Sequence, residues 1–114
     1  MYIVLDKDNA PVALIENMMI LDNTSKSVIG IIIGDCFFGK QNHVIGKIFK
    51  EHAYLVSGDI IGKVVHNENY VSSAPSKEQV AAAWDILSGI TKHTSDWITE
   101  KNKWASISFK ESLS

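Results

Sequence analysis

Residues 43–65, HVIGKIFKEHAYLVSGDIIGKVV, contain almost the same phrase twice. VIGKI begins at Val44 and IIGKV begins at Ile60, and their glycines are Gly46 and Gly62. A short apolar phrase that returns at a fixed spacing is typical of proteins built from repeated structural units. The stretch therefore indicates that this chain uses one small unit more than once.

The phrase also continues upstream. Gly30, in VIGIII, precedes Gly46 by the same spacing, and Ala13, in PVALIE, precedes Gly30 by one position more. An aliphatic residue precedes each small residue, and another follows two positions later. The first set is Val12, Ile29, Ile45 and Ile61, and the second is Ile15, Ile32, Ile48 and Val64. We therefore predict four tandem units at about 1–17, 18–34, 35–51 and 52–68, within a β domain of residues 1–71.

Each unit is predicted to be a β-hairpin. In the third unit, Cys36–Phe38 precedes the polar residues 39–43 and a second strand at 44–49. The apolar runs are short, rich in β-branched residues and separated by Gly, Asn, Asp and Ser, which favours hairpins over helices. The remaining units give first strands at Tyr2–Leu5, Met18–Leu21 and Ala53–Val56, each followed by a polar turn and a strand around the small residue.

The small residue of each unit should face the core. Alternate residues share one face of a strand, so Val28, Gly30 and Ile32 should lie together, and Val44 should join the equivalent inner face of its own strand. Glycine weakens a strand unless another backbone approaches closely or the strand carries a bulge. The glycines therefore mark either a crowded axis around which four hairpins meet, or bulges without an axial role.

The outer face differs between the units. It carries Leu14 and Ile31 in the first two units but Lys47 and Lys63 in the last two. Lysine is expected to face water, whereas the apolar outer face of Leu14, Ile31 and Ile33 needs a cover. These three residues are our first candidates for a binding surface.

With these phrases in view, residues 1–71 resemble the four-fold β-flower family of small bacterial proteins. The resemblance rests on VIGIII, VIGKIF and IIGKVV, with PVALIE as a degenerate first copy that departs from the pattern at Pro11 and Ala13. It implies four hairpins around a pseudo-four-fold axis and no established activity or catalytic residue. A weaker resemblance, through GDIIGKVV alone, is to PRC-type β-barrels, which are small binding or adaptor modules.

Residues 72–114 are predicted to be a linker, a helix and a tail within the same globular unit. Ser76 and Gln79 form a capping-box pattern, and the helix should run over about 76–90. Its apolar stripe is Val80, Ala83, Trp84, Leu87 and Ile90. We expect Trp84 to be buried, with the helix docked on the outer face of the first two units or on a second subunit. Residues 104–109 alternate like a strand, and residues 95–103 are consistent with a short helix capped by Ser95. The predicted fold class is α+β.

The composition excludes few classes of function, and it suggests no cofactor. The 114 residues carry a net charge of −2, and all 11 basic residues are lysines, which disfavours nucleic acid because arginine is its usual reader. The single cysteine, Cys36, cannot form an internal disulfide and is predicted to be a buried, inert thiol. No signal peptide or membrane span is apparent, so we expect a cytoplasmic protein.

A few polar residues are candidates for chemistry. His43 and Asp59 both stand three residues before a glycine, so neighbouring hairpins could bring them together as an acid–base pair. Both lie in predicted turns, where such residues are common without any chemical role. A metal site drawn from His52, His66, Glu51 and Glu68 matches no zinc spacing.

Two tryptophans are candidates for ligand contact. Trp97 and Trp104 lie in polar surroundings and could stack on a sugar, a base or a proline.

The sequence best supports a non-enzymatic binding or scaffold module that forms homo-oligomers or binds a protein partner. One alternative is a small hydrolase that uses His43 or His52 between the hairpins. Another is a weak binder of sugar or single-stranded nucleic acid, with Lys47, Lys63 and Tyr54 on one surface.

Overall fold

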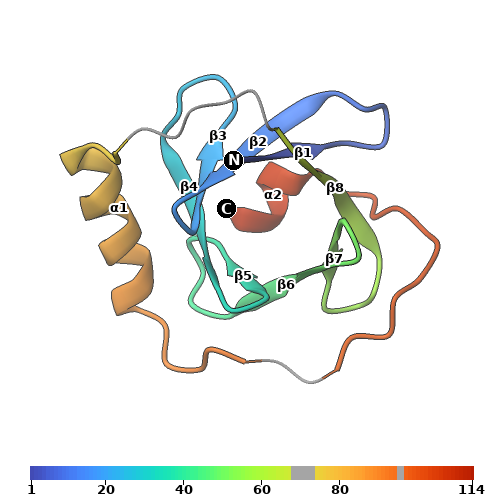
Figure 1. Ribbon diagram of the computed structural model, residues 1–114. Helices are drawn as coiled ribbons and strands as arrows, with labels where there is room; N and C mark the ends of the chain where they lie inside the picture. Colours follow the sequence, from blue (N-terminus) through green and yellow to red (C-terminus); the bar gives the residue numbers. More distant parts are fainter. Residues whose placement is uncertain (68–73, 95–96) are drawn as a thin grey trace.

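The computed structural model describes residues 1–67, 74–94 and 97–114. Eight antiparallel strands form a closed barrel in which each strand pairs with its neighbours in the sequence and β1 pairs with β8 (Figure 1). The strands are β1 Tyr2–Leu5, β2 Pro11–Glu16, β3 Met19–Asp22, β4 Val28–Ile33, β5 Cys36–Phe38, β6 Val44–Phe49, β7 His52–Leu55 and β8 Ile60–His66. They lie within a residue or two of the predicted positions, and the β-dominated fold is confirmed.

Each of the hairpins β1–β2, β3–β4, β5–β6 and β7–β8 contains one register shift. In β3–β4, Ile20 pairs with Gly30 but Leu21 pairs with Val28, so Ile29 is an extra residue. An extra residue of this kind is a β-bulge, which bends the strand and increases its twist. The bulged residues are Val12, Ile29, Ile45 and Ile61, the aliphatic residues directly before the small ones.

The bulge reverses part of the face assignment made from alternation. Ile29 packs against the barrel core beside Gly30, whereas Val28 lies outside with Leu14 and Val44 lies outside against the cluster of Ile31. The prediction that Val28 and Val44 face the core is therefore wrong. One inserted residue turns every side chain before it to the opposite face of the strand.

Two of the glycines beside the bulges face the backbone of the next hairpin, whereas a Cβ on Gly62 would meet the side chain of Val4. A Cβ built on Gly30 would lie 2.5 Å from the carbonyl oxygen of Phe38, and one on Gly46 would collide with the carbonyl oxygen of Tyr54. Close backbone approach is the usual reason for glycine within a strand. The glycines thus let neighbouring hairpins cross closely at the bulges.

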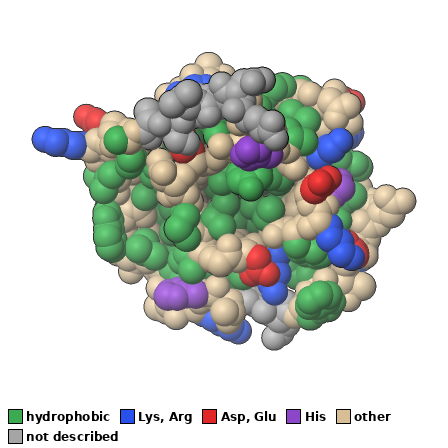
Figure 2. Space-filling view, viewed as in Figure 1, with side chains coloured by type: hydrophobic (Ala, Val, Ile, Leu, Met, Phe, Trp, Pro, Cys, Tyr) green, Lys and Arg blue, Asp and Glu red, His purple; other side chains and the backbone are tan. Residues whose placement is uncertain are grey.

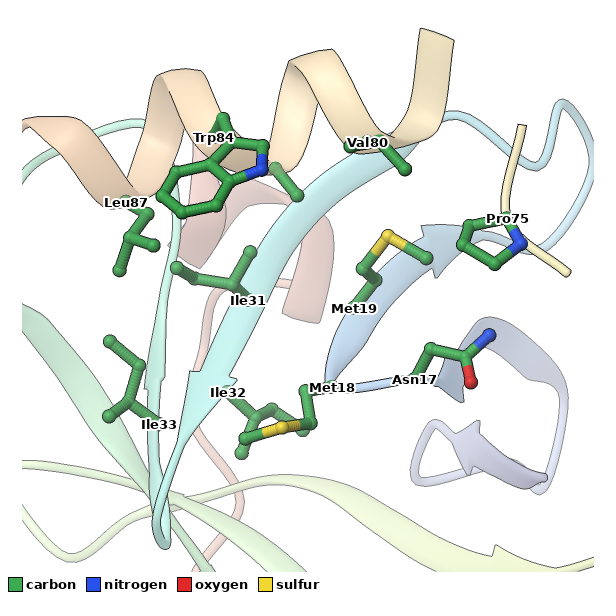
Figure 3. Close-up of a pocket in the computed structure, with 11 residues that line it drawn as sticks. Asn17, Met18, Met19, Ile31, Ile32, Ile33, Pro75, Val80, Trp84 and Leu87 are labelled. Atoms are coloured by element: carbon green, nitrogen blue, oxygen red, sulfur yellow. The ribbon is translucent and has the colours of Figure 1, made fainter. Parts of the chain in front are cut away.

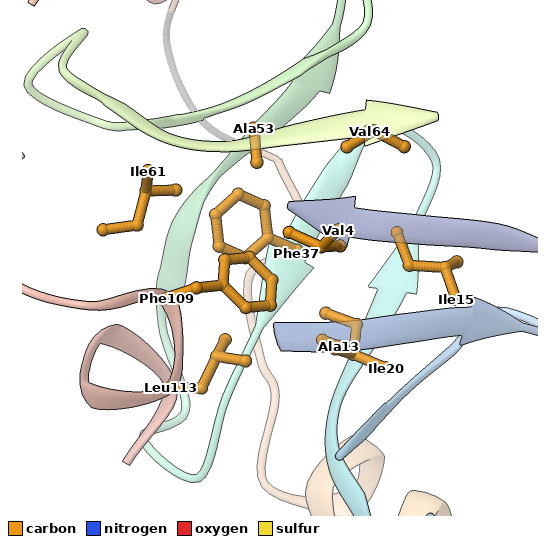
Figure 4. Packing of buried hydrophobic residues seen from close by; sticks show 10 residues of the cluster. All are labelled: Val4, Ala13, Ile15, Ile20, Phe37, Ala53, Ile61, Val64, Phe109 and Leu113. Carbon is orange, nitrogen blue, oxygen red and sulfur yellow. The ribbon is translucent and has the colours of Figure 1, made fainter. Parts of the chain in front are cut away.

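The centre of the barrel is filled by side chains, two of which come from the end of the chain. Helix α2, Phe109–Leu113, inserts Phe109 and Leu113 into the core beside Phe37 (Figures 1 and 4). Both residues are almost fully buried, and the Phe37 and Phe109 rings lie 5.8 Å apart. The tail therefore closes one end of the barrel.

The predicted strand at 104–109 is wrong. Of these residues, Trp104 alone forms a bridge, parallel to Ile60, and the chain then turns into α2. Ser108 and Glu111 form a capping box that starts this helix, a signal that is visible in SFKE. The apolar alternation reflects burial of Phe109 in the barrel. Residues 97–103 are not helical, and Ser95 lies outside the described residues.

Helix α1, Lys77–Ser88, begins at the predicted capping box of Ser76 and Gln79 and ends at Gly89. It packs on the outside of the barrel against β4, where Leu87 and Ile90 contact the cluster of Ile31. The docking on the outer face is as expected. The burial of Trp84 is not, because its side chain is 62% exposed. A single twisted strand covers only a narrow stripe of the helix, and Trp84 lies at its edge.

Candidate functional site

An apolar groove runs between α1 and the β3–β4 hairpin. Its volume is about 290 Å³. Figure 3 shows Trp84 and Val80 on the helix above Ile31 and Met19, with Met18 on the adjoining turn. The remaining lining residues are Asn17, Ile32, Ile33, Pro75, Ala83 and Leu87. Hollows with this apolar lining are typical of binding sites.

The turn between β2 and β3 places an apolar side chain at the edge of the groove. Asn17 and Met18 have φ angles of 53° and 64°, as in the two-residue turns of tight hairpins. Glycine or asparagine normally occupies such positions, and another side chain costs about 1–2 kcal/mol. Met18 is nevertheless 61% exposed there. Backbone strain that supports an exposed apolar side chain points to a functional role.

Exposed apolar side chains border the groove. Met18, Val80 and Trp84 are among the large hydrophobic residues that the fold leaves exposed, and all three line the groove. Contiguous apolar surface on a small protein marks an interaction site. We refer to these three residues and the groove between them as the apolar groove.

Two of the three predicted outer-face residues lie at this site. Ile31 is buried in its floor and Ile33 is half-buried at its edge. Leu14 is instead buried with Met19 and Leu21. The prediction missed Met18 because it placed this residue at the start of a strand over Met18–Leu21, whereas the structure places it in the turn before β3.

A second cleft, of about 490 Å³, brings together His43 and Trp97. Asn42, Lys92 and Ile98 also line it. The indole of Trp97 is 84% exposed, and its ring lies 6.4 Å from that of Phe49. This cleft offers an aromatic face with polar groups beside it.

The structure separates His43 from Asp59. Asp59 forms an ion pair with Lys101 at 3.9 Å and does not line the cleft of His43. Within residues 1–67, no hydrogen bond or ion pair joins the two. His52 donates from Nδ1 to the carbonyl of Lys50 at 2.9 Å, and its ring lies 5.8 Å from that of Tyr54 at an angle of 48°.

The loop before α2 is tied to β7 through Glu100. The Tyr54 hydroxyl donates to Glu100 at 3.2 Å, and Lys50 forms an ion pair with the same carboxylate. Burial and this hydrogen bond raise the pKa of Tyr54, whereas the hydrogen bond from Lys50 lowers the pKa of Glu100. Tyr54 is buried, so its ring does not form an open stacking surface with Lys47 and Lys63. Trp104 is half-buried in the same cluster.

The other predicted sites are not assembled. Glu68 lies outside the described residues, and the described residues contain no group of three or more His, Cys, Asp or Glu side chains positioned for a metal ion. Cys36 is buried beneath α1, with its Sγ 3.6 Å from Asp35 Oδ1.

No family model, curated protein or solved structure matches this chain. Of the described helices, none has the length and apolar character needed to cross a bilayer.

Proposed function

We propose that this protein is a non-enzymatic binding module that self-associates through the apolar groove. The observation that carries the proposal is the exposed Met18 on a strained turn, directly beside an apolar hollow that also has Trp84 at its edge. A merely structural turn would gain stability from glycine or asparagine at this position. The exposed methionine is therefore available for a contact outside one copy of the chain.

A second copy of the chain suits this surface because the surface offers both exposed apolar side chains and a recess. In a two-fold dimer the same patch meets itself, so it must supply both protrusions and a recess. Met18 and Trp84 protrude, and the hollow over Ile31 lies between them. Tryptophan is also frequent among the residues that dominate binding energy, and methionine adapts well to irregular apolar pockets.

We further propose that the barrel consists of four copies of one hairpin around a pseudo-four-fold axis, in keeping with the resemblance to the four-fold β-flower family. Support comes from the bulged residues Val12, Ile29, Ile45 and Ile61, which recur at a nearly constant spacing along the chain. Each bulge precedes the small residue of its unit. A repeated unit of this kind agrees with a scaffold role and supplies no catalytic set.

The test compares the oligomeric state of the wild-type chain with that of Met18→Asn and Trp84→Ala by sedimentation velocity over a range of concentrations. We expect the wild type to dimerise and each variant to weaken the dimer by roughly 30-fold or more, as for a central interface residue. Asparagine tolerates the left-handed backbone, so Met18→Asn should not unfold the barrel. Trp97→Ala, which removes an exposed indole outside the groove, is the matched control. A monomeric wild type, or a Met18→Asn dimer of unchanged affinity, would contradict the proposal.

A second candidate function is weak sugar binding at the cleft of Trp97 and His43. The exposed indole beside Asn42 and Lys92 supports it, because an aromatic face with nearby hydrogen-bonding groups suits a sugar ring. Titration with soluble oligosaccharides, followed by fluorescence in the wild type and in Trp97→Ala, tests it. No change in the wild-type signal would remove this candidate. The hydrolytic alternative has less support, because His43 lines the cleft of Trp97 whereas Asp59 forms an ion pair with Lys101.

A further inference from the structure

The end of the barrel opposite α2 is an open hollow with an aliphatic wall. One residue from each hairpin lines it, at the position two after the small residue: Ile15, Ile32, Ile48 and Val64. The hollow has a volume of about 350 Å³, within the range of small-molecule sites. In the view of Figure 2, hydrophobic side chains line a hollow over the centre of the ring of strands, and acidic side chains lie beside it. We refer to this hollow as the barrel mouth.

The rim of the barrel mouth is held in place by the tight turns. The amides of Ile48 and Val64 donate to the carbonyls of Asp35 and Glu51, each at 2.8 Å. Each of these bonds joins a mouth-lining residue to a turn residue at the rim. The acidic residues of the rim are therefore positioned by backbone hydrogen bonds, before any ligand arrives.

The rim is acidic and also carries an aromatic ring. Asp35 and Glu51 line the mouth, and the side chain of Asp35 is 60% exposed despite Lys47 at 4.0 Å. Tyr2 lines the same hollow, is exposed, and has its ring 5.0 Å from that of His66. Carboxylates and an aromatic ring above an aliphatic wall complement a cation that carries a hydrocarbon chain.

We propose that the barrel mouth binds alkylammonium ions, with the alkyl chain among the four aliphatic residues and the ammonium group at the rim between Asp35 and Glu51. Burial of the chain should tighten binding roughly fourfold for each added methylene until the hollow is full. The carboxylates select the cation over an anion with the same chain. This site is distinct from the apolar groove, because none of the described residues that line the groove is acidic.

The experiment titrates the full chain with n-hexylammonium, hexanol and hexanoate and follows backbone amide shifts by NMR. We expect the ammonium ion to bind tightest and hexanoate weakest, with shifts at Ile32, Ile48 and Val64. In the double variant Asp35→Asn/Glu51→Gln, the ammonium affinity should fall at least tenfold to that of hexanol, while hexanol binding is unchanged. Asp8→Asn, an exposed carboxylate in the turn of β1–β2, is the matched control.

Several results would overturn the proposal. They are the absence of binding by hexylammonium, equal affinity for hexanoate, equal affinity for methylammonium and hexylammonium, and a retained ammonium preference in the double variant. Trp84→Ala, which is expected to weaken self-association, should bind hexylammonium as the wild type does. Failure of the dimer and failure of the mouth site are thus distinguishable.

Discussion

The side chain that is missing from Gly46 leaves room for the backbone of the neighbouring hairpin. The bulge at Ile45 bends its strand, and the carbonyl of Tyr54 in the next hairpin then passes where a Cβ of Gly46 would stand. Ala13 occupies the equivalent place in the first hairpin and is fully buried. The first hairpin therefore has room for the methyl group of Ala13, whereas at Gly46 the neighbouring hairpin lies too close for one.

We expect Gly46→Ala to destabilise the fold by about 1–3 kcal/mol, because the added methyl meets the carbonyl of Tyr54 and a packed core resists expansion. Urea unfolding measures the change. Gly34→Asn is the control, since nothing lies within 4 Å of a Cβ there and asparagine tolerates its φ of 63°. Similar losses in the two variants would argue against the close approach at Gly46.

Asp22 makes stability depend on pH. A hydrogen bond from Lys110 of α2, at 2.6 Å, and the amides of Thr24 and Ser25 lower the pKa of Asp22 from 3.8 to about 2. Because the folded pKa is the lower one, the unfolded chain binds the proton more readily and stability rises with pH. The contribution is complete above 3.8 and is lost as pH falls through about 2. Asp22→Asn should remove this part of the pH dependence, as followed by urea midpoints over that range; an unchanged pH profile would contradict it.

Among the elements, α2 is short but supplies part of the core. Five residues cannot form a stable helix alone, so α2 depends on the barrel around it. In return it fills the space that eight strands leave inside. The amide of Lys40 donates to the carbonyl of Leu113 at 2.8 Å, which anchors the end of the chain to the barrel.

We predict that Phe109→Ala costs about 3–5 kcal/mol, because it removes a buried ring from the centre of the barrel. Chemical unfolding would measure the loss. Ile107→Ala in the same tail removes an exposed side chain and should change stability by less than about 0.5 kcal/mol. A stability loss at Ile107 as large as that at Phe109 would mean that α2 does not fill the core.

The contact between α1 and β4 can be tested by comparing a substitution beneath the helix with one on the uncovered outer face. Ile31→Lys should destabilise the fold by several kcal/mol, since it places an unpaired charge beneath the helix. Lys47→Ile should be tolerated, because the lysine it replaces makes only a 4.0 Å contact with Asp35. Thermal unfolding of both variants tests the assignment, and equal effects would show that the outer face is assigned wrongly.

The barrel as a whole has two unlike ends. One is closed by α2, whereas the other opens into the barrel mouth, next to the apolar groove (Figures 1 and 2). Ile32 lines both hollows, so they are adjacent surfaces of one face. The barrel mouth and the apolar groove, which we assign to binding, thus lie at the end of the barrel that α2 does not close.

Self-association should persist at high salt. The described residues that line the groove are apolar apart from the uncharged Asn17, so salt should not screen its contacts. Sedimentation velocity at low and high ionic strength would measure the dimer affinity. Dissociation on adding salt would instead indicate an interface built on charged residues, such as the rim of the barrel mouth.

Local chemistry that is visible in the sequence was enough to place the strands and α1, because turn residues, β-branched runs and the Ser76 capping box act over a few residues. It also indicated that Ile31 and Ile33 need a cover. The inner and outer faces could be assigned only from the folded barrel, since the bulge at Ile29 or Ile45 moves side chains to the opposite face without changing the apolar pattern. The destination of Phe109 and the exposure of Met18 and Trp84 likewise required the folded chain, because they depend on the space that a closed barrel leaves inside and on the width of surface that it offers to a helix.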